Sequence, residues 1–379
     1  MKKFIMAVWL FVQLPIVFGQ NLESKIDSLF IEQTKFHLIQ EATLKVFSPS
    51  KNIDVSFHHS AFENTDSMTH KQPFYTASIG KMFTALSIAI LQERGQLNFD
   101  DYISDHLSPD LMKDLHMINQ KSYGHLITIE HLLQHKSGLA DYFEDSTHSG
   151  QPKLIDHIFI DSEKFWTPQA LLQFYKANFN GKFIPGTDYH YTDTEYLLLG
   201  LIIEKVSQQA LHEFFKTEIF KPLGLNNTYL NLRSSPIKDT PKMMSLMAEV
   251  YNISSFRSLS ADWAGGGIVS TNSDLIKFLQ AVMHGSIIKP ETLNRMQNWT
   301  KESVGMNYGL GLRQVKFQEL SPYWDHIVIK GHSGVTGAFL FYCQELDTYI
   351  SGSLNQTEAN KEALIMIYDI LLAIKVKEK

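Results

Sequence analysis

Segments with strand-like sequence lie near both ends of this 379-residue chain, and a long middle portion separates them. Near the start, residues 42–47 and 55–62 flank a turn at residues 48–52, which predicts a hairpin. Because strands from both ends can be buried together in one sheet, the pattern predicts a sheet assembled from N- and C-terminal parts around an insertion. The late strands are expected at residues 327–329, 338–342 and 349–353.

Helical patterns dominate the middle portion, from about residue 101 to residue 230. We therefore predict an α/β (α+β) fold, with an antiparallel sheet flanked by helices and a mainly helical lobe. The sheet-containing lobe is expected to comprise residues 20–77 plus 240–379, and the helical lobe residues 78–239. A site is expected between the lobes, where clefts are common. Helices are predicted at residues 22–33, 78–94, 128–135, 167–178, 195–207, 273–283 and 358–376.

Residues 1–19 have the pattern of a secretory signal peptide. Two lysines precede an apolar run at residues 4–18, and small residues stand at Val17 and Gly19. The run is too short for a stable membrane span, so we expect cleavage before Gln20 and an exported protein without a membrane anchor. The only cysteine is Cys343, so neither an N-terminal lipid-bearing cysteine nor an intrachain disulfide is expected.

Charge and metal-ligand patterns exclude several other function classes. The net charge is −6 with both signs interspersed, which gives no basic surface for nucleic acid. His131 and His135 have the i, i+4 spacing of metal ligands, but the glutamate of the His-Glu-x-x-His motif is absent, so structural roles are expected. No metal or other cofactor is predicted. Residues 265–267, a run of three glycines, are expected to let the backbone pass close to a cleft rather than to bind phosphate.

Ser78 and Lys81 place a hydroxyl and an amine three residues apart where a helix begins. Side chains at this spacing share one face of a helix, and an amine there can take the serine proton. The pair alone recurs by chance, and its alternative interpretation is a helix cap beside a solvated lysine. Further motifs in order along the chain are needed to make the pair informative.

Two such motifs follow. Tyr191 and Asp193 stand two residues apart, just before an apolar helix. The later stretch 330–337 contains His332 and precedes an apolar strand. A core aromatic residue is the alternative interpretation of Tyr191, and a packed histidine without a ligand is the alternative for His332.

With these three motifs in this order, the chain resembles the serine β-lactamase and penicillin-binding-protein-like hydrolases. The specific resemblance is to the branch of class C β-lactamases, D-alanyl-D-alanine carboxypeptidases and related esterases. It covers nearly all of the chain after residue 19. It includes three further segments typical of that branch, at residues 128–139, 222–225 and 266–275.

The resemblance implies an acyl-enzyme mechanism. Ser78 attacks a carbonyl, Lys81 acts as base if burial keeps it partly neutral, and Tyr191 relays the proton to the leaving group and later activates water. The backbone N–H groups of Ser78 and Val335 form the oxyanion hole. The implied substrate-binding residues are Asp193, His332, Ser333 and Gly334.

Two departures from the branch bear on the substrate. Asp193 stands where asparagine is common, and an ionised carboxylate cannot donate a hydrogen bond to an amide carbonyl. Asp193 also favours the charged form of Lys81, which makes Tyr191 the base and puts efficient β-lactam hydrolysis in doubt. His332 replaces the lysine of class C β-lactamases, and a partly charged histidine holds a carboxylate more weakly.

The sequence therefore predicts an exported serine hydrolase that acts through an acyl-enzyme on an amide or ester. A D-amino-acid peptide or a β-lactam-related compound is the leading substrate. Two alternatives stay open, a small-ester esterase and a β-lactam-binding sensor that does not turn over. The expected partner is a small-molecule or peptide substrate, while the natural substrate and the oligomeric state are left undetermined.

Overall fold

The computed structural model describes residues 14–36, 38–62, 71–357 and 359–376. Its main sheet has eight strands in the order β10-β11-β12-β13-β14-β15-β1-β2, and every neighbouring pair is antiparallel. The strands are β1 (Glu41–Ser48), β2 (Ile53–Ser60), β10 (Thr300–Ser303), β11 (Met306–Tyr308), β12 (Arg313–Lys316), β13 (Val328–Ser333), β14 (Ala338–Cys343) and β15 (Thr348–Ser353).

The N- and C-terminal parts of the chain meet inside this sheet. Strand β1 pairs with β15, from Thr43 opposite Ser353 to Phe47 opposite Tyr349. This confirms the α/β class with one antiparallel sheet built from both ends. The hairpin β1–β2 is also present, although β2 begins at Ile53 and ends at Ser60, two residues earlier than the sequence pattern indicated.

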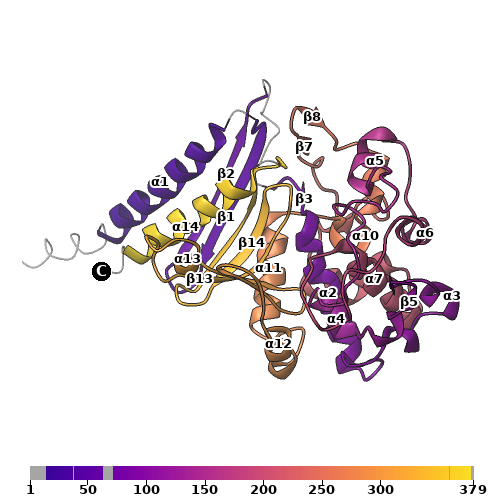
Figure 1. Cartoon of the computed structure of the whole chain (residues 1–379). Helices are drawn as coiled ribbons and strands as arrows, with labels where there is room; N and C mark the ends of the chain where they lie inside the picture. Colours follow the sequence, from indigo (N-terminus) through magenta and orange to yellow (C-terminus); the bar gives the residue numbers. More distant parts are fainter. Residues whose placement is uncertain (1–13, 37, 63–70, 358, 377–379) are drawn as a thin grey trace, which may run out of the picture.

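Helices cover both faces of the sheet (Figure 1). The terminal helices α1 (Leu14–Thr34) and α14 (Asn360–Val376) pack together on one face, where Phe30 and Ile367 belong to one apolar core. Helix α11 (Asn272–Met283) packs on the other face against β1, β14 and β15. Every residue of β14 and β15 is buried, because helices cover both sides of these strands.

Helices α7 (Asp193–Ser207), α8 (Leu211–Phe215) and α10 (Trp263–Gly266) pack against α2 (Gly80–Glu93), whose residues from Gly80 to Leu91 are all buried. This explains why the sequence of α2 is apolar on all sides rather than amphipathic. The others are α3 (Pro109–Met112), α4 (Ile129–Leu133), α5 (Leu154–Ile160), α6 (Pro168–Asn178), α9 (Lys221–Leu223), α12 (Pro290–Met296) and α13 (Phe317–Leu320).

A small sheet in the order β3-β9-β6 lies at the start of α2, and two short hairpins complete the structure. Strand β3 leads directly into the turn that carries Ser78. The strands are β3 (Phe74–Tyr75), β9 (Ile268–Ser270), β6 (Tyr229–Leu230), β4 (Met117–Ile118), β5 (Lys121–Ser122), β7 (Met247–Ala248) and β8 (Tyr251–Asn252).

Several sequence predictions differ from the structure. The helix expected at residues 128–135 ends at Leu133, because His135 adopts a positive φ of 60° that a helix does not tolerate. Strands β10, β11 and β12 were missed, since they are short and β10 is polar and partly exposed. The predicted signal peptide lies largely outside the described residues. None of the helices within the described ranges is long and apolar enough to cross a membrane.

Candidate active site

Ser78 lies on a 3-10 turn (Ala77–Ile79) that joins β3 to α2. The turn begins with Ala77 at a φ of 46°, a conformation that costs energy for any residue with a Cβ. The position of the turn is fixed by Gly80, which follows it. A Cβ on Gly80 would come within 2.8 Å of the Gly266 Cα atom. The start of α2 therefore packs backbone against backbone on α10, and Ser78 is held half-buried at this junction.

Lys81 is fully buried one turn after Ser78. Its Nζ atom donates to the Ser78 Oγ at 3.2 Å and to the Gly265 carbonyl at 3.2 Å, and it forms an ion pair with Asp193. Burial alone lowers the pKa of Lys81, but the Asp193 carboxylate outweighs it and raises that pKa. The partly neutral lysine base considered from the sequence is therefore not present in the resting site, where Lys81 is a cation.

Asp193 begins helix α7 and reaches Lys81 from a distant part of the chain. Its backbone N–H donates to the Asp141 Oδ1 at 3.0 Å. Gly265 passes so close that a Cβ there would be 2.4 Å from the Asp193 Oδ1. This confirms that the glycine run lets the backbone pass close to the site.

Tyr191 is the third residue of this group. Its ring centroid lies 4.9 Å from Lys81 Nζ and 5.5 Å from the Arg313 guanidinium, and the neighbouring Ser78 side chain lowers the pKa of its hydroxyl. Burial raises the pKa of Tyr191, while the charges of Lys81 and Arg313 oppose the increase. The structure thus brings Ser78, Lys81 and Tyr191 together around the Ser78 hydroxyl.

His135 holds the segment that carries Tyr191, a role that no sequence motif indicated. Its carbonyl accepts from the His190 N–H at 2.9 Å, and its Nδ1 accepts from the Thr192 N–H at 3.3 Å. The two residues that flank Tyr191 are therefore both bound to His135, and the His135 and Tyr191 ring centroids are 4.2 Å apart.

The Glu195 carboxyl group holds the His135 ring in place. One carboxyl oxygen pairs with the His135 Nδ1, and the other accepts from the Ser137 N–H at 3.0 Å. Burial raises the pKa of Glu195 well above its usual range and lowers the pKa of His135 well below its own. Burial therefore favours the neutral forms of both residues, which share a proton across the contact between the Glu195 carboxyl and the His135 Nδ1.

His332 does not occupy the place expected from the sequence. Its side chain is completely buried, with Nε2 3.0 Å from the Tyr308 hydroxyl and Nδ1 2.7 Å from the Ser333 carbonyl. Burial lowers the pKa of His332 well below its usual value, and the nearby Arg313 lowers it further. The expected direct contact between His332 and a substrate carboxylate is corrected, because this ring is neutral and enclosed.

Arg313 is the cation that the sequence analysis missed at this position. It lies on β12, forms a two-point ion pair with Glu302 at 2.6 and 2.7 Å, and donates from Nη1 to the Ser333 Oγ at 3.1 Å. The ion pair fixes the guanidinium plane and leaves one edge toward Ser333. A lone arginine on a short strand carries no recognisable motif, so only the fold reveals it.

The segment after β13 closes the site opposite α2. A Cβ on Gly334 would be 2.4 Å from the Thr76 carbonyl, so glycine is needed for this close approach. Ser78 and Val335 line the same openings. In the described part of the chain, neither the Ser78 nor the Val335 N–H has an intramolecular acceptor. The two donors are thus available to a bound oxygen atom.

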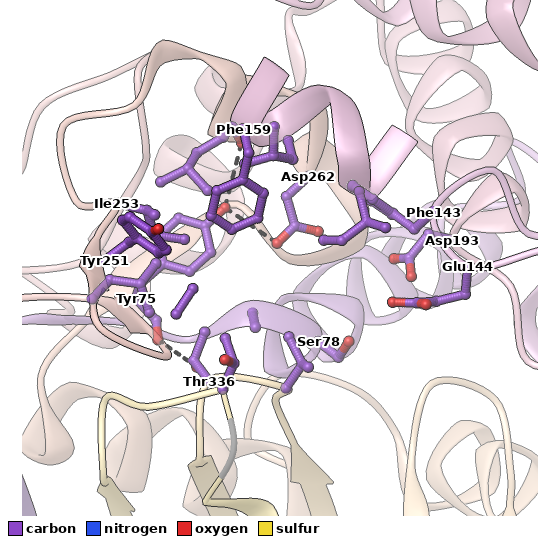
Figure 2. Close-up of a pocket in the computed structure, with 18 of the residues that line it drawn as sticks. Tyr75, Ser78, Phe143, Glu144, Phe159, Asp193, Tyr251, Ile253, Asp262 and Thr336 are labelled. Carbon is purple, nitrogen blue, oxygen red and sulfur yellow. Dashed lines mark hydrogen bonds between the residues drawn. The ribbon is translucent and has the colours of Figure 1, made fainter. Parts of the chain in front are cut away.

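Two cavities meet at this point and share Ser78, Tyr191 and Val335. The larger, about 620 Å³, we call the acidic cavity (Figure 2). Its ionisable acidic lining residues are Asp141, Glu144, Asp193, Glu249 and Asp262. The smaller, about 340 Å³, we call the arginine cavity, because Arg313 is the one charged residue among those described as lining it.

Two aspartates of the acidic cavity titrate near neutrality. Burial and the charge of Asp193 raise the pKa of Asp141 to about 7 and that of Asp262 to about 7. The Tyr75 hydroxyl donates to the Asp262 Oδ2 at 3.1 Å. Lys81 forms an ion pair with Asp193. The other carboxylates of the acidic cavity have no cation among its described lining residues.

The candidate metal ligands have structural partners. His131 completes the capping box of α4 through Nδ1 and the Thr128 N–H at 3.2 Å, whereas His135 pairs with Glu195. Over the described ranges, no three His, Cys, Asp or Glu side chains are grouped as metal ligands.

Penicillin-binding protein 4* of Bacillus subtilis (strain 168) is a curated relative with a similar sequence. It is 28% identical over 318 residues, which are 77% of this chain and 63% of the relative. The chain thus spans less than two thirds of the length of the first curated relatives that it matches.

Solved structures share the fold over nearly the whole chain. The D-amino acid amidase of Ochrobactrum anthropi SV3, complexed with L-phenylalanine amide, has a TM-score of 0.76 at 22% identity and covers 95% of this chain and 100% of its own. A D-stereospecific amidohydrolase from Streptomyces sp. has a TM-score of 0.72 at 23% identity and covers 86% of this chain and 93% of its own. A family model described as Beta-lactamase matches residues 42–375. With the model matching across the sheet, α2 and the site between them, the chain belongs to the Beta-lactamase family.

Proposed function

We propose that this chain is a serine hydrolase that cleaves an amide or ester through an acyl-enzyme on Ser78. The observation that carries the proposal is the Ser78 hydroxyl, which is 3.2 Å from Lys81 Nζ and lies beside Tyr191 where two cavities meet. A nucleophile at such a junction can bind an acyl group on one side and a leaving group on the other.

Tyr191 is the proton carrier in this mechanism. The Ser78 Oγ bonds to the carbonyl carbon while its proton passes to the Tyr191 phenolate oxygen, and the carbonyl oxygen becomes an oxyanion held by the Ser78 and Val335 N–H groups. Collapse breaks the bond to the leaving nitrogen or oxygen, which takes the proton from Tyr191. Water then attacks the ester carbon, gives its proton to Tyr191, and the Ser78 oxygen leaves with that proton.

In these reaction steps Lys81 acts as a fixed positive charge rather than as the base. Its ammonium lies 4.9 Å from the Tyr191 ring centroid and lowers the pKa of that phenol against the effect of burial. Asp193 keeps the ammonium charged throughout. The populated free enzyme therefore holds a neutral phenol, and the reactive phenolate fraction grows with pH.

A D-amino-acid peptide is the leading substrate class. The similarity to a penicillin-binding protein and to D-amino acid amidase folds supports it. The arginine cavity supplies a cation for a carboxylate on the leaving group, in the place first expected for His332. A β-lactam sensor is the second candidate, because an aspartate at position 193 cannot donate to a β-lactam side-chain amide, which disfavours efficient turnover of a bound β-lactam.

Intact-protein mass spectrometry tests the proposal with a panel of esters, D-alanyl peptides and β-lactams. A hydrolase releases product and shows at most a transient adduct, whereas a sensor keeps a stable adduct on Ser78. Ser78→Ala should abolish both turnover and fluorophosphonate labelling. Ser333→Ala is the matched control in the same site and should still be labelled. Labelling of Ser78→Ala at the unmodified rate would refute the nucleophile.

Export is proposed from the signal-like residues 1–19. The mature protein should begin at or near Gln20. N-terminal sequencing of protein recovered outside the cytoplasm checks this, and an N-terminus at Met1 in that fraction contradicts it.

A further inference from the structure

The acidic cavity has two unlike ends. Figure 2 shows Ser78, Asp193 and Glu144 toward one end, with Asp262 facing the centre, and the rings of Tyr75 and Tyr251 at the other. None of the described lining residues is a lysine, arginine or histidine. A substrate group that fills this cavity therefore meets negative charge close to the nucleophile and apolar surface farther away.

We propose that the acidic cavity binds an acyl group with a free ammonium beside the scissile carbonyl and an apolar side chain. Such a group is the N-terminal residue of a short peptide, amino acid amide or amino acid ester. This inference rests on the proposed hydrolase function and specifies which end of the substrate the cavity reads. It distinguishes an enzyme that needs a free amine from one that accepts an N-acylated peptide.

Asp262 is the residue that best fits the ammonium. Its Oδ2 accepts from the Tyr75 hydroxyl at 3.1 Å, while no described residue hydrogen-bonds to its Oδ1. A Cβ on Gly266 would come within 2.6 Å of both carboxyl oxygens, so the carboxylate lies directly against bare backbone. A carboxylate held this way gains a partner when a cation enters the cavity.

The other carboxylates are already occupied to different degrees. Lys81 pairs with Asp193, and the backbone N–H groups of Asp193 and Glu144 donate to the two oxygens of Asp141 at 3.0 and 3.1 Å. Glu144 has Lys153 at 3.6 Å, outside the set of lining residues. These groups add negative potential. Glu249 also lines the cavity with no hydrogen-bond partner described for its carboxylate, but it is exposed, whereas Asp262 is partly buried and has an uncommitted acceptor.

The length of an α-amino acid matches this arrangement. Its nitrogen is two bonds from the carbonyl carbon, so a carbonyl at Ser78 places the ammonium at the same end of the cavity as the carboxylates. The side chain then extends toward the apolar end. That end is lined by Phe159, Tyr251 and Ile253, and the rings of Phe159 and Tyr251 make an edge-to-face contact with centroids 6.5 Å apart.

An N-acylated residue fits less well. Its amide nitrogen carries no charge, so it brings no ion pair to Asp262. A close, desolvated charge pair contributes on the order of 1.4 kcal/mol or more, which is a tenfold difference in binding. The amine preference should therefore be at least about tenfold.

The test compares kcat/KM for D-phenylalanine p-nitroanilide with that for its N-acetyl derivative, at pH 7.5 for both substrates. The unmodified enzyme should prefer the free amine by about tenfold or more. Asp262→Asn keeps the shape and an acceptor for Tyr75, and it should bring the ratio close to one. Asp105→Asn, on an exposed turn that lines neither cavity, is the matched control and should keep the ratio.

The outcomes separate the inference from the function on which it rests. Equal rates for the two substrates, both abolished by Ser78→Ala, would overturn the amine site and leave the hydrolase in place. Absence of fluorophosphonate labelling and of turnover would instead refute the hydrolase. If Asp262→Asn does not fold, the ratio measured on the unmodified enzyme still decides. A preference for the N-acetyl substrate would overturn the inference directly.

Discussion

The acidic cavity and the arginine cavity share Ser78 but have opposite charge. The first has five carboxylates among its described lining residues, and the second has Arg313. They also come from different parts of the fold. Helix α5, the hairpin β7–β8 and segments around the start of α7 contribute to the acidic cavity, whereas strands β12–β14 and helix α14 build most of the arginine cavity. If the proposed hydrolase function holds, we expect the opposite charges of the two cavities to orient a substrate across Ser78.

The charges in the two cavities are also compensated differently. Glu302 pairs with Arg313 at two points, so the guanidinium is fixed and partly neutralised before a ligand enters. Asp262 has only a tyrosine hydroxyl as partner. Because an uncompensated charge gains more from a new partner than a compensated one, we expect the acidic cavity to discriminate more strongly.

The largest expected effect falls on both cavities together. Tyr191→Phe should lower kcat by about 100-fold or more for every substrate, because the same phenol serves the acyl and the leaving group. In the unmodified enzyme, kcat/KM for a neutral ester should rise about tenfold per pH unit above neutrality, since burial raises the pKa of Tyr191 and its phenolate is scarce.

The control for this measurement is Ser78→Ala, which gives the background of uncatalysed ester hydrolysis at each pH. The pH-dependent rise should vanish in Tyr191→Phe. A loss of less than about threefold in kcat, or an unchanged pH profile, would remove Tyr191 from proton transfer.

Glu195 should have the next largest effect, through His135 and Tyr191. Glu195→Ala removes the support of His135 and should lower kcat by about tenfold with little change in KM, as expected for a positioning residue. Glu195→Gln keeps a donor for the His135 Nδ1 and an acceptor for the Ser137 N–H, so its kcat should stay within about threefold of the unmodified value. Steady-state kinetics on one ester measures both variants, and equal losses would contradict the neutral pair.

Arg313 should separate the two cavities. Arg313→Lys keeps a positive charge but loses the planar two-point geometry. We expect about a tenfold rise in KM for a D-dipeptide with a free carboxylate, a much smaller change for its C-terminal amide, and an unchanged preference for the free amine. The same loss for both dipeptides would show that Arg313 supports the fold rather than binding a carboxylate.

The smallest expected effect is on stability. The folded-state pKa of Asp262, about 7, lies above its ordinary value, so this group favours the folded protein at low pH. That contribution is lost as pH rises from about 4 to about 7. Asp262→Asn removes this pH-dependent contribution. As pH rises from 5 to 8, the unfolding free energy of the unmodified protein should therefore fall by about 1–2 kcal/mol more than that of the variant.

Chemical unfolding at the two pH values measures this difference. The exposed Asp105→Asn variant should show no such change with pH. A constant difference between Asp262→Asn and the unmodified protein would mean that Asp262 is already ionised at pH 5.

Much of the architecture could be predicted from local patterns. The hairpin β1–β2, the helix α2 and the late strands β14 and β15 follow from alternation and from continuous apolar runs. The missed strands β10 to β12 are short and lack a continuous apolar run, because they lie toward the outer edge of the sheet. Their place was therefore set by pairing with β13 rather than by their own sequence.

The sequence by itself determined which residues could surround Ser78. A three-residue spacing sets Lys81 beside Ser78 on consecutive backbone turns, and the short segment before α7 carries Tyr191 and Asp193 together. Spacings of this kind are local, so they can be read without knowing the fold.

Only the tertiary structure decided protonation and access. The fold brings Asp193 of α7 next to Lys81 of α2, and this ion pair keeps Lys81 charged. His332 is enclosed by Tyr308 and Arg313, and burial and the Arg313 charge favour its neutral form. Asp262 faces a cavity for the same reason, since its surroundings come from segments far apart in the chain. Burial and charge–charge distance are properties of the folded neighbourhood, and these quantities set the pKa and the reach of each group.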